Sequence, residues 1–278
     1  MTTYEDIKHE NPLIRDVQKR LWKLNDNWLS IITGDTGSGK SWTALSLAEK
    51  IDPDFNTDKV VLRPENFVKK VANREWGQGD VVVFDEAGAG MSAKQHMTKK
   101  NQIIDQVLQT FRRQNIAVIF TVPSEANVDK SIRRLLHTYM ETKTIDYVNE
   151  RNHIKWLNID YNRKADKLYY KYPKMKDSNG AVKKLKTVKL GKPSEDLIDA
   201  YEAKRSEYQD RKNKEFYNEL VEQLNDEEDD KDNQIRTKKD KIRQELKEDE
   251  DKGTKELADK YDTDMAYISQ IKARLAKG

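Results

Sequence analysis

Residues 34–41 read GDTGSGKS, and this short stretch decides which fold the sequence predicts. It matches the P-loop pattern G-x4-G-K-[ST], in which glycines let the backbone wrap closely around phosphate oxygens. An apolar strand-like segment, residues 29–33, comes before it, and a helical pattern, residues 41–51, comes after it. A glycine-rich turn that binds no ligand does not need a strand before it and a helix after it. The stretch therefore predicts a nucleoside triphosphate site.

We expect the loop and the first turn of its helix to bind ATP and Mg²⁺. The free N–H groups and partial positive charge at the start of a helix favour phosphate oxygens. Lys40 is expected to reach the β- and γ-phosphates, and the Ser41 hydroxyl is expected to ligate Mg²⁺. The residues expected to bind the nucleotide are Gly34, Asp35, Thr36, Gly37, Ser38, Gly39, Lys40, Ser41 and Trp42.

Two carboxylates follow the apolar segment VVVF at residues 81–84. A carboxylate at the C-terminal end of a buried parallel strand lies where α/β folds bind their ligands. Asp85 fits a partner of Mg²⁺, and Glu86 fits the base that polarises the attacking water. The alternative is an Asp-Glu pair that merely ends a strand, and the P-loop upstream disfavours it.

Three further residues are candidates for contact with the γ-phosphate. Thr121 ends the apolar segment 116–121 and is expected at the γ-phosphate if this strand lies between the strands that carry the P-loop and Asp85. Its alternative role is a hydrogen bond within a turn. Arg112 and Arg113 close the preceding helical segment. They can act as arginine fingers for a neighbouring subunit, worth about 10³–10⁵ in rate, or only complement the helix dipole.

The pattern along the chain predicts an α/β fold with a parallel sheet covered by helices on both faces. Apolar strand-like segments alternate with helical ones up to about residue 142. Segments 80–84 and 116–121 are rich in β-branched residues, as buried parallel strands are. Residues 12–28 predict an amphipathic helix with Leu13 and Leu24 on its apolar face.

Composition restricts the class of protein. The chain has 278 residues, 36% of them charged, which leaves room for one substantial core and a polar, helix-rich remainder. It has no Cys and four His, which argues against disulfides and a structural zinc site. Its apolar runs are of strand length, and its first residues lack the apolar stretch of a signal peptide. We therefore expect a cytoplasmic protein with no membrane partner.

Three stretches together resemble a known group of ATPases. They are TGDTGSGKS (33–41), VVVFDEAG (81–88) and FRRQNIAVIFTVP (111–123). They resemble the FtsK–HerA group of P-loop ATPases, and within it the archaeal and phage proteins of the zonula-occludens-toxin-like or DNA-packaging type. The resemblance covers residues 29–146. It implies a RecA-like core, ATP hydrolysis, DNA as the track and a homo-oligomer, in this group a hexameric ring.

The resemblance also makes Arg112 the better match to the trans-acting arginine, with Arg113 next. One position departs from the group, whose last core strand usually ends in Thr-Gln. Here Thr121 is followed by Val122. The missing glutamine implies slower or differently coupled hydrolysis.

A basic segment follows the core. Residues 151–192 contain thirteen Lys or Arg and three Asp, a net charge of +10 in a chain whose total is +3. Alternating apolar residues and the Asn179-Gly180 pair predict antiparallel hairpins there. Basic side chains interleaved with aromatic ones can bind DNA, duplex in preference to single-stranded, or form a solvated appendage. The candidate DNA contacts are Lys155, Arg163, Lys164, Lys183 and Lys184.

Residues 255–275 predict a helix-turn-helix with Asp262 in the turn and Thr263 or Asp264 as the N-cap of the second helix. Such a hairpin binds DNA or another protein. Its predicted interior consists of Leu257, Ala258, Tyr261, Ile268, Ile271 and Leu275. Its candidate DNA contacts are Tyr267, Gln270, Lys272 and Arg274.

The predicted domains are an N-terminal helix (1–27), a P-loop ATPase core (28–146), a basic antiparallel β-extension (147–192), a charged helix with an acidic linker (193–233) and a helix-turn-helix (234–278). Three functions stay open. The first is a DNA-dependent, ATP-hydrolysing oligomeric motor that translocates DNA. The second is an ATP-dependent DNA-binding switch whose nucleotide state controls assembly, with little turnover. The third is a small-molecule kinase, which the Asp-Glu pair and the DNA-binding features disfavour.

Overall fold

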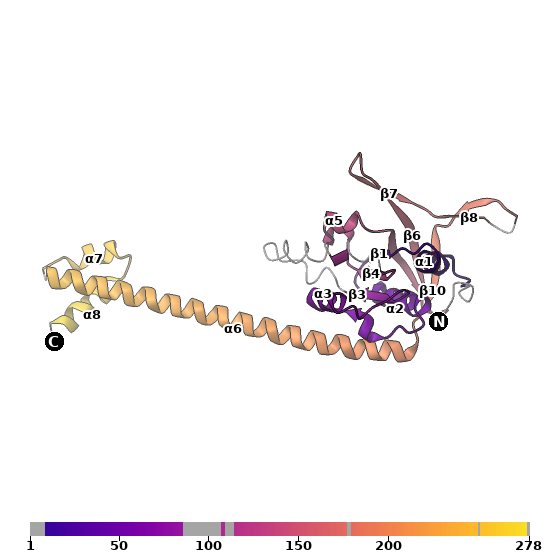
Figure 1. Ribbon diagram of the computed structural model, residues 1–278. Coiled ribbons are helices and arrows are strands. Elements are labelled where there is room, and N and C mark those ends of the chain that lie inside the picture. Colours follow the sequence, from indigo (N-terminus) through magenta and orange to yellow (C-terminus); the bar gives the residue numbers. More distant parts are fainter. Residues whose placement is uncertain (1–8, 86–106, 109–113, 177–178, 250, 277–278) are drawn as a thin grey trace. The chain divides into compact units, whose positions relative to one another are not determined.

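The computed structural model describes residues 9–85, 107–108, 114–176, 179–249 and 251–276. The chain divides into two compact units, Met1–Tyr208 and Gln209–Gly278. The larger unit has a mixed, mainly parallel sheet with helices on its faces, so the predicted α/β class is confirmed (Figure 1).

Five parallel strands form the centre of the larger unit, in the order β5-β1-β4-β3-β2. They are β1 (Trp28–Thr33), β2 (Val60–Val61), β3 (Val81–Phe84), β4 (Ala117–Thr121) and β5 (Thr138–Asp146). Every residue of β1, β3 and β4 is buried, which explains their continuous apolar sequences. Strand β4 lies between β1 and β3, which is the arrangement that the expected role of Thr121 at the γ-phosphate requires.

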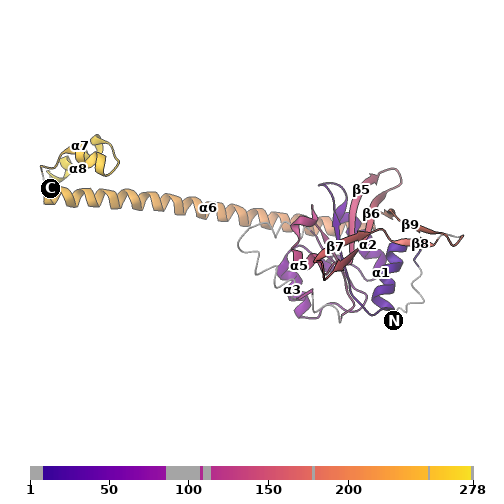
Figure 2. The ribbon, with the colours of Figure 1, turned by 90° about the horizontal axis from the view of Figure 1, so that it is seen from above.

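Antiparallel strands continue the same sheet beyond β5. They are β6 (Arg151–Asn162), which pairs with β5, and β7 (Lys167–Lys171) and β10 (Thr187–Gly191), which pair with β6. A separate pair, β8 (Lys174–Lys176) and β9 (Val182–Lys184), flanks Gly180. The φ angle of Gly180 is +78°, which suits the tight turn predicted there. The β8–β9 hairpin extends away from the sheet (Figure 2).

Helices cover both faces of the sheet. Helices α1 (Pro12–Trp22) and α2 (Lys40–Ile51) pack in one apolar cluster with one face of the strands. Helices α3 (Pro64–Ala72) and α5 (Lys130–Arg133) pack in a second cluster with the other face. Successive residues of a strand point to opposite faces, so the clusters take alternate residues of β1, β3 and β4. Two short 3₁₀ helices lie at Thr57–Lys59 and Glu125–Asn127.

Helix α1 is shorter than the sequence predicts, because it ends at Trp22 rather than near residue 28. Asn25 has a φ angle of +53°, in the left-handed region, which ends a right-handed helix. Leu24 is 59% exposed, so its predicted place on the apolar face is wrong.

One helix, α6 (Glu195–Glu248), follows β10 and enters both units. The sequence predicts an acidic linker that breaks this helix at residues 225–233, and the structure contradicts it, because the helix continues through these residues. No Gly or Pro stands between Pro193 and Gly253, so no residue in this stretch carries the large helix penalty of those two types.

The smaller unit has its own apolar cluster. Helices α7 (Thr254–Lys260) and α8 (Met265–Leu275) form a hairpin, and Ile242 and Leu246 of α6 complete the cluster between them. The predicted interior is confirmed: Leu257, Ala258, Ile268 and Ile271 are buried, and Tyr261 and Leu275 pack against them. Asp262 has a φ angle of +45°, and Asp264 caps α8 by accepting from the Ala266 N–H at 2.9 Å.

Candidate nucleotide site

The loop GDTGSGKS joins β1 to α2 at the C-terminal edge of the parallel sheet. Its glycines are required at two positions in particular. Gly34 has a φ angle of +149°, and a Cβ atom there would lie 2.0 Å from Thr142 Oγ1. Gly39 has a φ angle of +82°, and a Cβ atom there would lie 2.9 Å from Asn152 Nδ2. Residues of β5 and β6 lie so close to the loop that only glycine fits at these two positions.

Side chains of β5 and β6 hold the loop by hydrogen bonds. The hydroxyls of Thr142 and Ser38 are 2.7 Å apart. Asn152 Nδ2 donates to Thr43 Oγ1 at 2.6 Å, and it lies 3.4 Å from the carbonyl oxygens of Ser38 and Gly39. The antiparallel strand β6 thus supports the P-loop, which the sequence motif does not indicate.

Lys40 extends along the loop. Its Nζ donates to the carbonyl oxygens of Gly34 at 2.8 Å and Asp35 at 2.7 Å. A phosphate in the loop would give this ammonium group a charged acceptor in place of neutral ones, and charge-assisted hydrogen bonds are about twice as strong. Lys40 is therefore placed for the role that the motif predicts.

Asp85 is the centre of the polar contacts at the ends of β3 and β4. It is fully buried, and its Oδ1 accepts from Ser41 Oγ at 2.9 Å and from Thr121 Oγ1 at 2.5 Å. Because β3 and β4 are neighbouring parallel strands, their carboxyl ends bring Asp85 and Thr121 together. The structure thus joins three of the predicted site residues, and Thr121 contacts Asp85 directly.

Helix α6 supplies residues that sequence reasoning missed. The Tyr201 hydroxyl donates to Asp85 Oδ2, and the side chain of Tyr201 is buried. Burial, reinforced by the negative charge of Asp85, raises the pKa of Tyr201, so the hydroxyl keeps the proton that it donates. Lys204 Nζ donates to the carbonyl oxygens of Thr57 at 2.5 Å and Val60 at 2.8 Å, which holds this part of α6 against the core.

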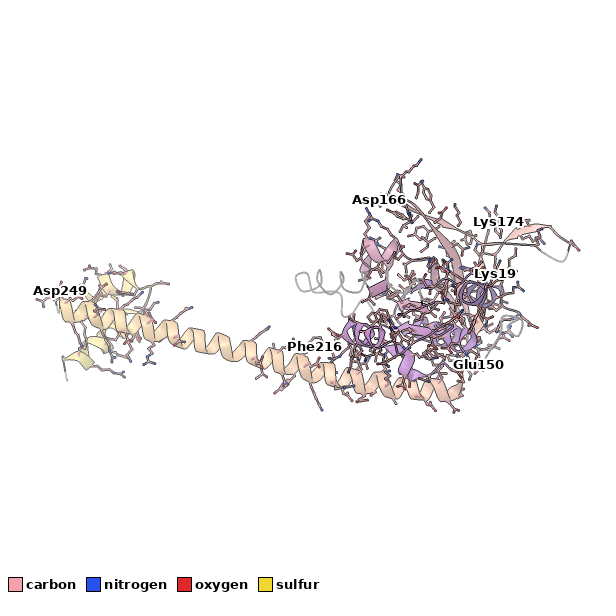
Figure 3. The ribbon with its side chains drawn as sticks, in the orientation of Figure 1. Lys19, Glu150, Asp166, Lys174, Phe216 and Asp249 are labelled. Atoms are coloured by element: carbon pink, nitrogen blue, oxygen red, sulfur yellow. The ribbon has the colours of Figure 1, made fainter. Side chains whose placement is uncertain are left out.

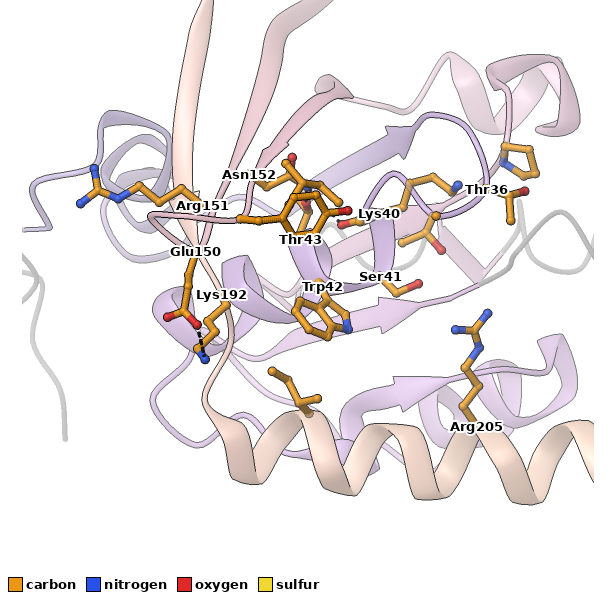
Figure 4. Close-up of a pocket in the computed structure, with 18 of the residues that line it drawn as sticks. Thr36, Lys40, Ser41, Trp42, Thr43, Glu150, Arg151, Asn152, Lys192 and Arg205 are labelled. Atoms are coloured by element: carbon orange, nitrogen blue, oxygen red, sulfur yellow. Dashed lines mark hydrogen bonds and ion pairs between the residues drawn. The ribbon is translucent and has the colours of Figure 1, made fainter.

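A cavity of ≈ 910 Å³ lies beside these groups. Its walls include the P-loop, Trp42, Thr121 and Arg205 of α6. Figure 4 shows Arg205 at one end of the cavity and the ion pair of Glu150 and Lys192 at the other. The volume is in the range of about 300–1,000 Å³ that small-molecule sites occupy.

The residues present fit a nucleotide with Mg²⁺. Asn152 Oδ1 is buried at the cavity wall and has no hydrogen-bond partner within the described part of the chain, so a donor on a ligand can satisfy it. Among the residues that the structure describes, no cluster of three or more His, Asp or Glu could hold a metal ion by itself. Mg²⁺ in nucleotide sites is held by one or two protein groups together with phosphates, and Ser41 and Asp85 are the groups that would serve here.

Glu86, Arg112 and Arg113 lie outside the described residues, so their predicted roles remain predictions. The predicted nucleotide residues Thr36, Gly37, Gly39, Lys40, Ser41 and Trp42 line the cavity.

The candidate DNA residues of the larger unit lie in different settings. Arg163 and Lys164 are exposed in the turn between β6 and β7, and Lys183 and Lys184 are exposed on β9. Lys155 forms an ion pair with Glu141 at 3.0 Å. Figure 3 marks Asp166 and Lys174, which lie close to these two hairpins in the chain. Trp156, one of the aromatic residues of the basic segment, is buried in the core and is not available to stack on bases.

On α8, Gln270 and Arg274 are exposed. Tyr267 packs against the apolar cluster, and Lys272 Nζ donates to the carbonyl oxygen of Lys252 at 2.5 Å. Of the four predicted DNA contacts on this helix, two are therefore engaged in the fold of the unit.

Strand order, P-loop position and the contact of Ser41 with Asp85 together define a P-loop NTPase fold. The profile of the zonular occludens toxin (Zot) family matches residues 48–187, half of the chain, and the chain belongs to this family. The matched segment includes Asp85, Thr121 and Asn152 and begins after the P-loop. A search of curated proteins gave no match.

Several solved structures are similar to part of the chain. One is the N-terminal domain of zonular occludens toxin from Neisseria meningitidis, at 18% identity over 52% of this chain and 93% of that one, with a TM-score of 0.37. Another is B204, the DNA-packaging ATPase of Sulfolobus turreted icosahedral virus, at 17% identity over 54% and 98%, with a TM-score of 0.32. A KaiC-like protein from Pyrococcus horikoshii has 11% identity over 53% and 90%, with a TM-score of 0.29.

No helix within the described part of the chain has the length and apolar character needed to cross a membrane.

Proposed function

We propose that this protein is an ATP-hydrolysing, DNA-dependent oligomeric motor of the FtsK–HerA group. The observation that supports ATP as the ligand is the placement of Lys40 and Ser41 in the cavity wall, with Asp85 buried behind Ser41 and hydrogen-bonded to it. In this arrangement Lys40 contacts the β- and γ-phosphates and Ser41 ligates Mg²⁺. Asp85 orients the Mg²⁺ shell through Ser41, while Thr121 holds the carboxylate in place.

Hydrolysis is assigned to Glu86, which directly follows Asp85 in the chain. As the carboxylate that follows Asp85 in the sequence, it would polarise the attacking water. Arg112 or Arg113 of a neighbouring subunit completes the site in a homo-oligomer, which by resemblance is a hexameric ring. This gives hydrolysis a dependence on assembly that a monomeric enzyme lacks.

DNA binding is assigned to the exposed basic hairpins and to α8. The basic charge of residues 151–192 neutralises phosphates, and each phosphate contact releases a counterion. Duplex DNA is the preferred track. Gln270 and Arg274 lie on the exposed surface of the α7–α8 hairpin, where they can contact the DNA. Here α7–α8 acts as a helix-turn-helix.

One observation favours the alternative of a DNA-binding switch with little turnover. The residue after Thr121 is Val122, which is fully buried. Its side chain has no amide group, unlike the glutamine that is usual at this position. The γ-phosphate then lacks the group that the related ATPases place at this position. Nucleotide would in that case set assembly on DNA rather than drive movement.

The test is steady-state ATP hydrolysis by the full chain, alone and with duplex or single-stranded DNA, at two salt concentrations. Stimulation by DNA that weakens with salt is expected for the motor. Tight DNA binding with negligible turnover would favour the switch, and a Lys40→Ala variant gives the background rate. A protein that neither binds nor hydrolyses ATP would overturn both.

A further inference from the structure

The first turns of α6 form one wall of the nucleotide site. Tyr201 and Arg205 are four residues apart, so they lie side by side on one face of the helix. Tyr201 contacts Asp85, and Arg205 lines the cavity. Lys204 ties the same stretch to backbone carbonyls of the core. This wall belongs to the same compact unit as the P-loop.

Arg205 is held where its guanidinium can reach a ligand. Its neighbour Tyr201 is buried and tied to Asp85, so the helix turn that carries Arg205 has a fixed position against the site. Arg205 follows Tyr201 by about one helical turn, so the two side chains are neighbours, and the positive charge of Arg205 partly opposes the rise in the pKa of Tyr201. Figure 4 shows the Arg205 side chain rising from α6 toward the side of the cavity where Ser41 and Thr36 lie.

The location of Arg205 in the cavity indicates which part of a bound nucleotide it would contact. Ser41, whose hydroxyl would hold Mg²⁺ beside the terminal phosphates, is on the Arg205 side of the cavity. The opposite end, with Glu150 and Lys192, is left for the ribose and base. Arginine suits a phosphate because its planar fork can donate two parallel hydrogen bonds.

We propose that Arg205 is a binding residue for the terminal phosphate of ATP, supplied by the same chain as the P-loop. This inference rests on the proposed nucleotide-binding function. It assigns to α6, a helix with no recognisable nucleotide motif, the ability to distinguish a triphosphate from a diphosphate. It also predicts a cation at the γ-phosphate that does not depend on a neighbouring subunit, in contrast to Arg112 or Arg113.

The experiment is calorimetric binding of a non-hydrolysable ATP analogue and of ADP, each with Mg²⁺, to the full chain. The variants are Arg205→Ala, Arg205→Lys and, as a matched arginine on the same helix outside the cavity lining, Arg211→Ala. Arg205→Ala should lower the affinity for the ATP analogue by about tenfold to a hundredfold, as loss of a charged hydrogen bond does. It should lower the affinity for ADP by less than about threefold. Arg205→Lys should lie between, and Arg211→Ala should match wild type.

Two further measurements separate contact from structural support. The melting temperature without nucleotide should be the same for Arg205→Lys and wild type, since the charge and stem are kept. The affinity ratio of ATP analogue to ADP should not change between low and high protein concentration, because the group acts within one chain. A ratio that changes with concentration would overturn the proposal.

The outcomes are distinguishable from those for the proposed function. Wild type that binds neither nucleotide would overturn both. Wild type that binds the ATP analogue, together with an Arg205→Ala variant that keeps the same preference for it over ADP, would overturn only the role of Arg205. An equal loss for both nucleotides would also overturn it.

Discussion

The hydroxyl of Tyr201, on α6, donates a hydrogen bond to the buried carboxylate of Asp85 at the end of β3. More than a hundred residues of chain separate them. The contact uses the carboxylate oxygen that Ser41 and Thr121 leave open, since both of these donate to the other oxygen. Removal of α6 from this position would therefore leave a buried acceptor without its donor.

A Tyr201→Phe variant tests this contact directly. It keeps the buried ring and removes only the hydroxyl, so we expect the free energy of unfolding to fall by about 1–3 kcal/mol, the cost of an unsatisfied buried acceptor. Urea denaturation followed by tryptophan fluorescence measures it. Tyr217→Phe is the control, because Tyr217 lies on the same helix and is 67% exposed, so loss of its hydroxyl leaves no buried group without a partner. Equal stability of Tyr201→Phe and wild type would contradict the contact.

Glu86→Gln should separate binding from hydrolysis. The amide keeps the size of the side chain but cannot accept a proton from water, so turnover should fall by about 10²–10⁴-fold. ATP binding, measured by calorimetry, should stay within about threefold of wild type. Normal turnover in this variant would remove Glu86 from its assigned role.

Arg112→Ala should lose hydrolysis in a way that saturating ATP does not restore, because a trans-acting arginine stabilises the transition state rather than binding the substrate. The loss should be about 10³-fold or more. Mixing this variant with an equal amount of Lys40→Ala should restore part of the activity, since each supplies the residue that the other lacks. If Arg112→Ala hydrolyses ATP normally, Arg113 takes its place as the candidate.

The exposed turn between β6 and β7 should contribute to the salt dependence of DNA binding. If Arg163 and Lys164 each neutralise one phosphate, the double alanine variant should reduce the slope of log K against log salt by about 1.8 for a duplex. Lys171→Ala is the matched control, because Lys171 is already paired with Asp160 at 2.6 Å. An unchanged slope in the double variant would place the DNA elsewhere.

Acid should loosen the α7–α8 hairpin through Glu245. Hydrogen bonds from Lys260, Tyr261 and Lys252 lower the pKa of Glu245 to about 2, from an ordinary value of 4.5. A carboxylate whose folded pKa is lowered stabilises the fold above about pH 4.5 and loses this effect as the pH falls toward 2. Glu245→Gln should therefore speed hydrogen exchange of residues 254–275 at pH 7 and match wild type near pH 2. Glu248→Gln, on the same helix, is the control, because the Glu248 carboxylate accepts from the neutral side-chain amide of Gln244.

The sequence predicts the parts of the fold whose signals are local. The P-loop, the apolar strands β3 and β4, and the acid that ends β3 each depend on neighbouring residues only. The sequence does not indicate β5 as a parallel strand, because its residues alternate between buried and half-buried up to Thr142 and are exposed or half-buried from Lys143 on. Its pattern reflects its position beside the antiparallel β6 rather than deep in the parallel sheet.

The remaining site residues carry no local signal. Asn152 is one polar residue in a polar strand, and Tyr201 and Arg205 stand in a highly charged helix. Their roles follow from the register of β6 against β5 and from the packing of α6 on the core, which are set by contacts between distant segments. The same limit applies to Trp156, because the sequence alone leaves open whether its ring stacks on DNA or packs in the core, where the structure places it.

Asp85 takes its donors from three separate stretches: Ser41 precedes the segment that matches the family, Thr121 lies within it, and Tyr201 follows it. A chimera that received only residues 48–187 from a relative would combine a foreign carboxylate with the resident loop and the resident helix. Such an exchange would succeed only where the ends of the incoming strands fit both the resident loop with Ser41 and the resident helix with Tyr201. A protein that shares only the family segment therefore does not share the complete site.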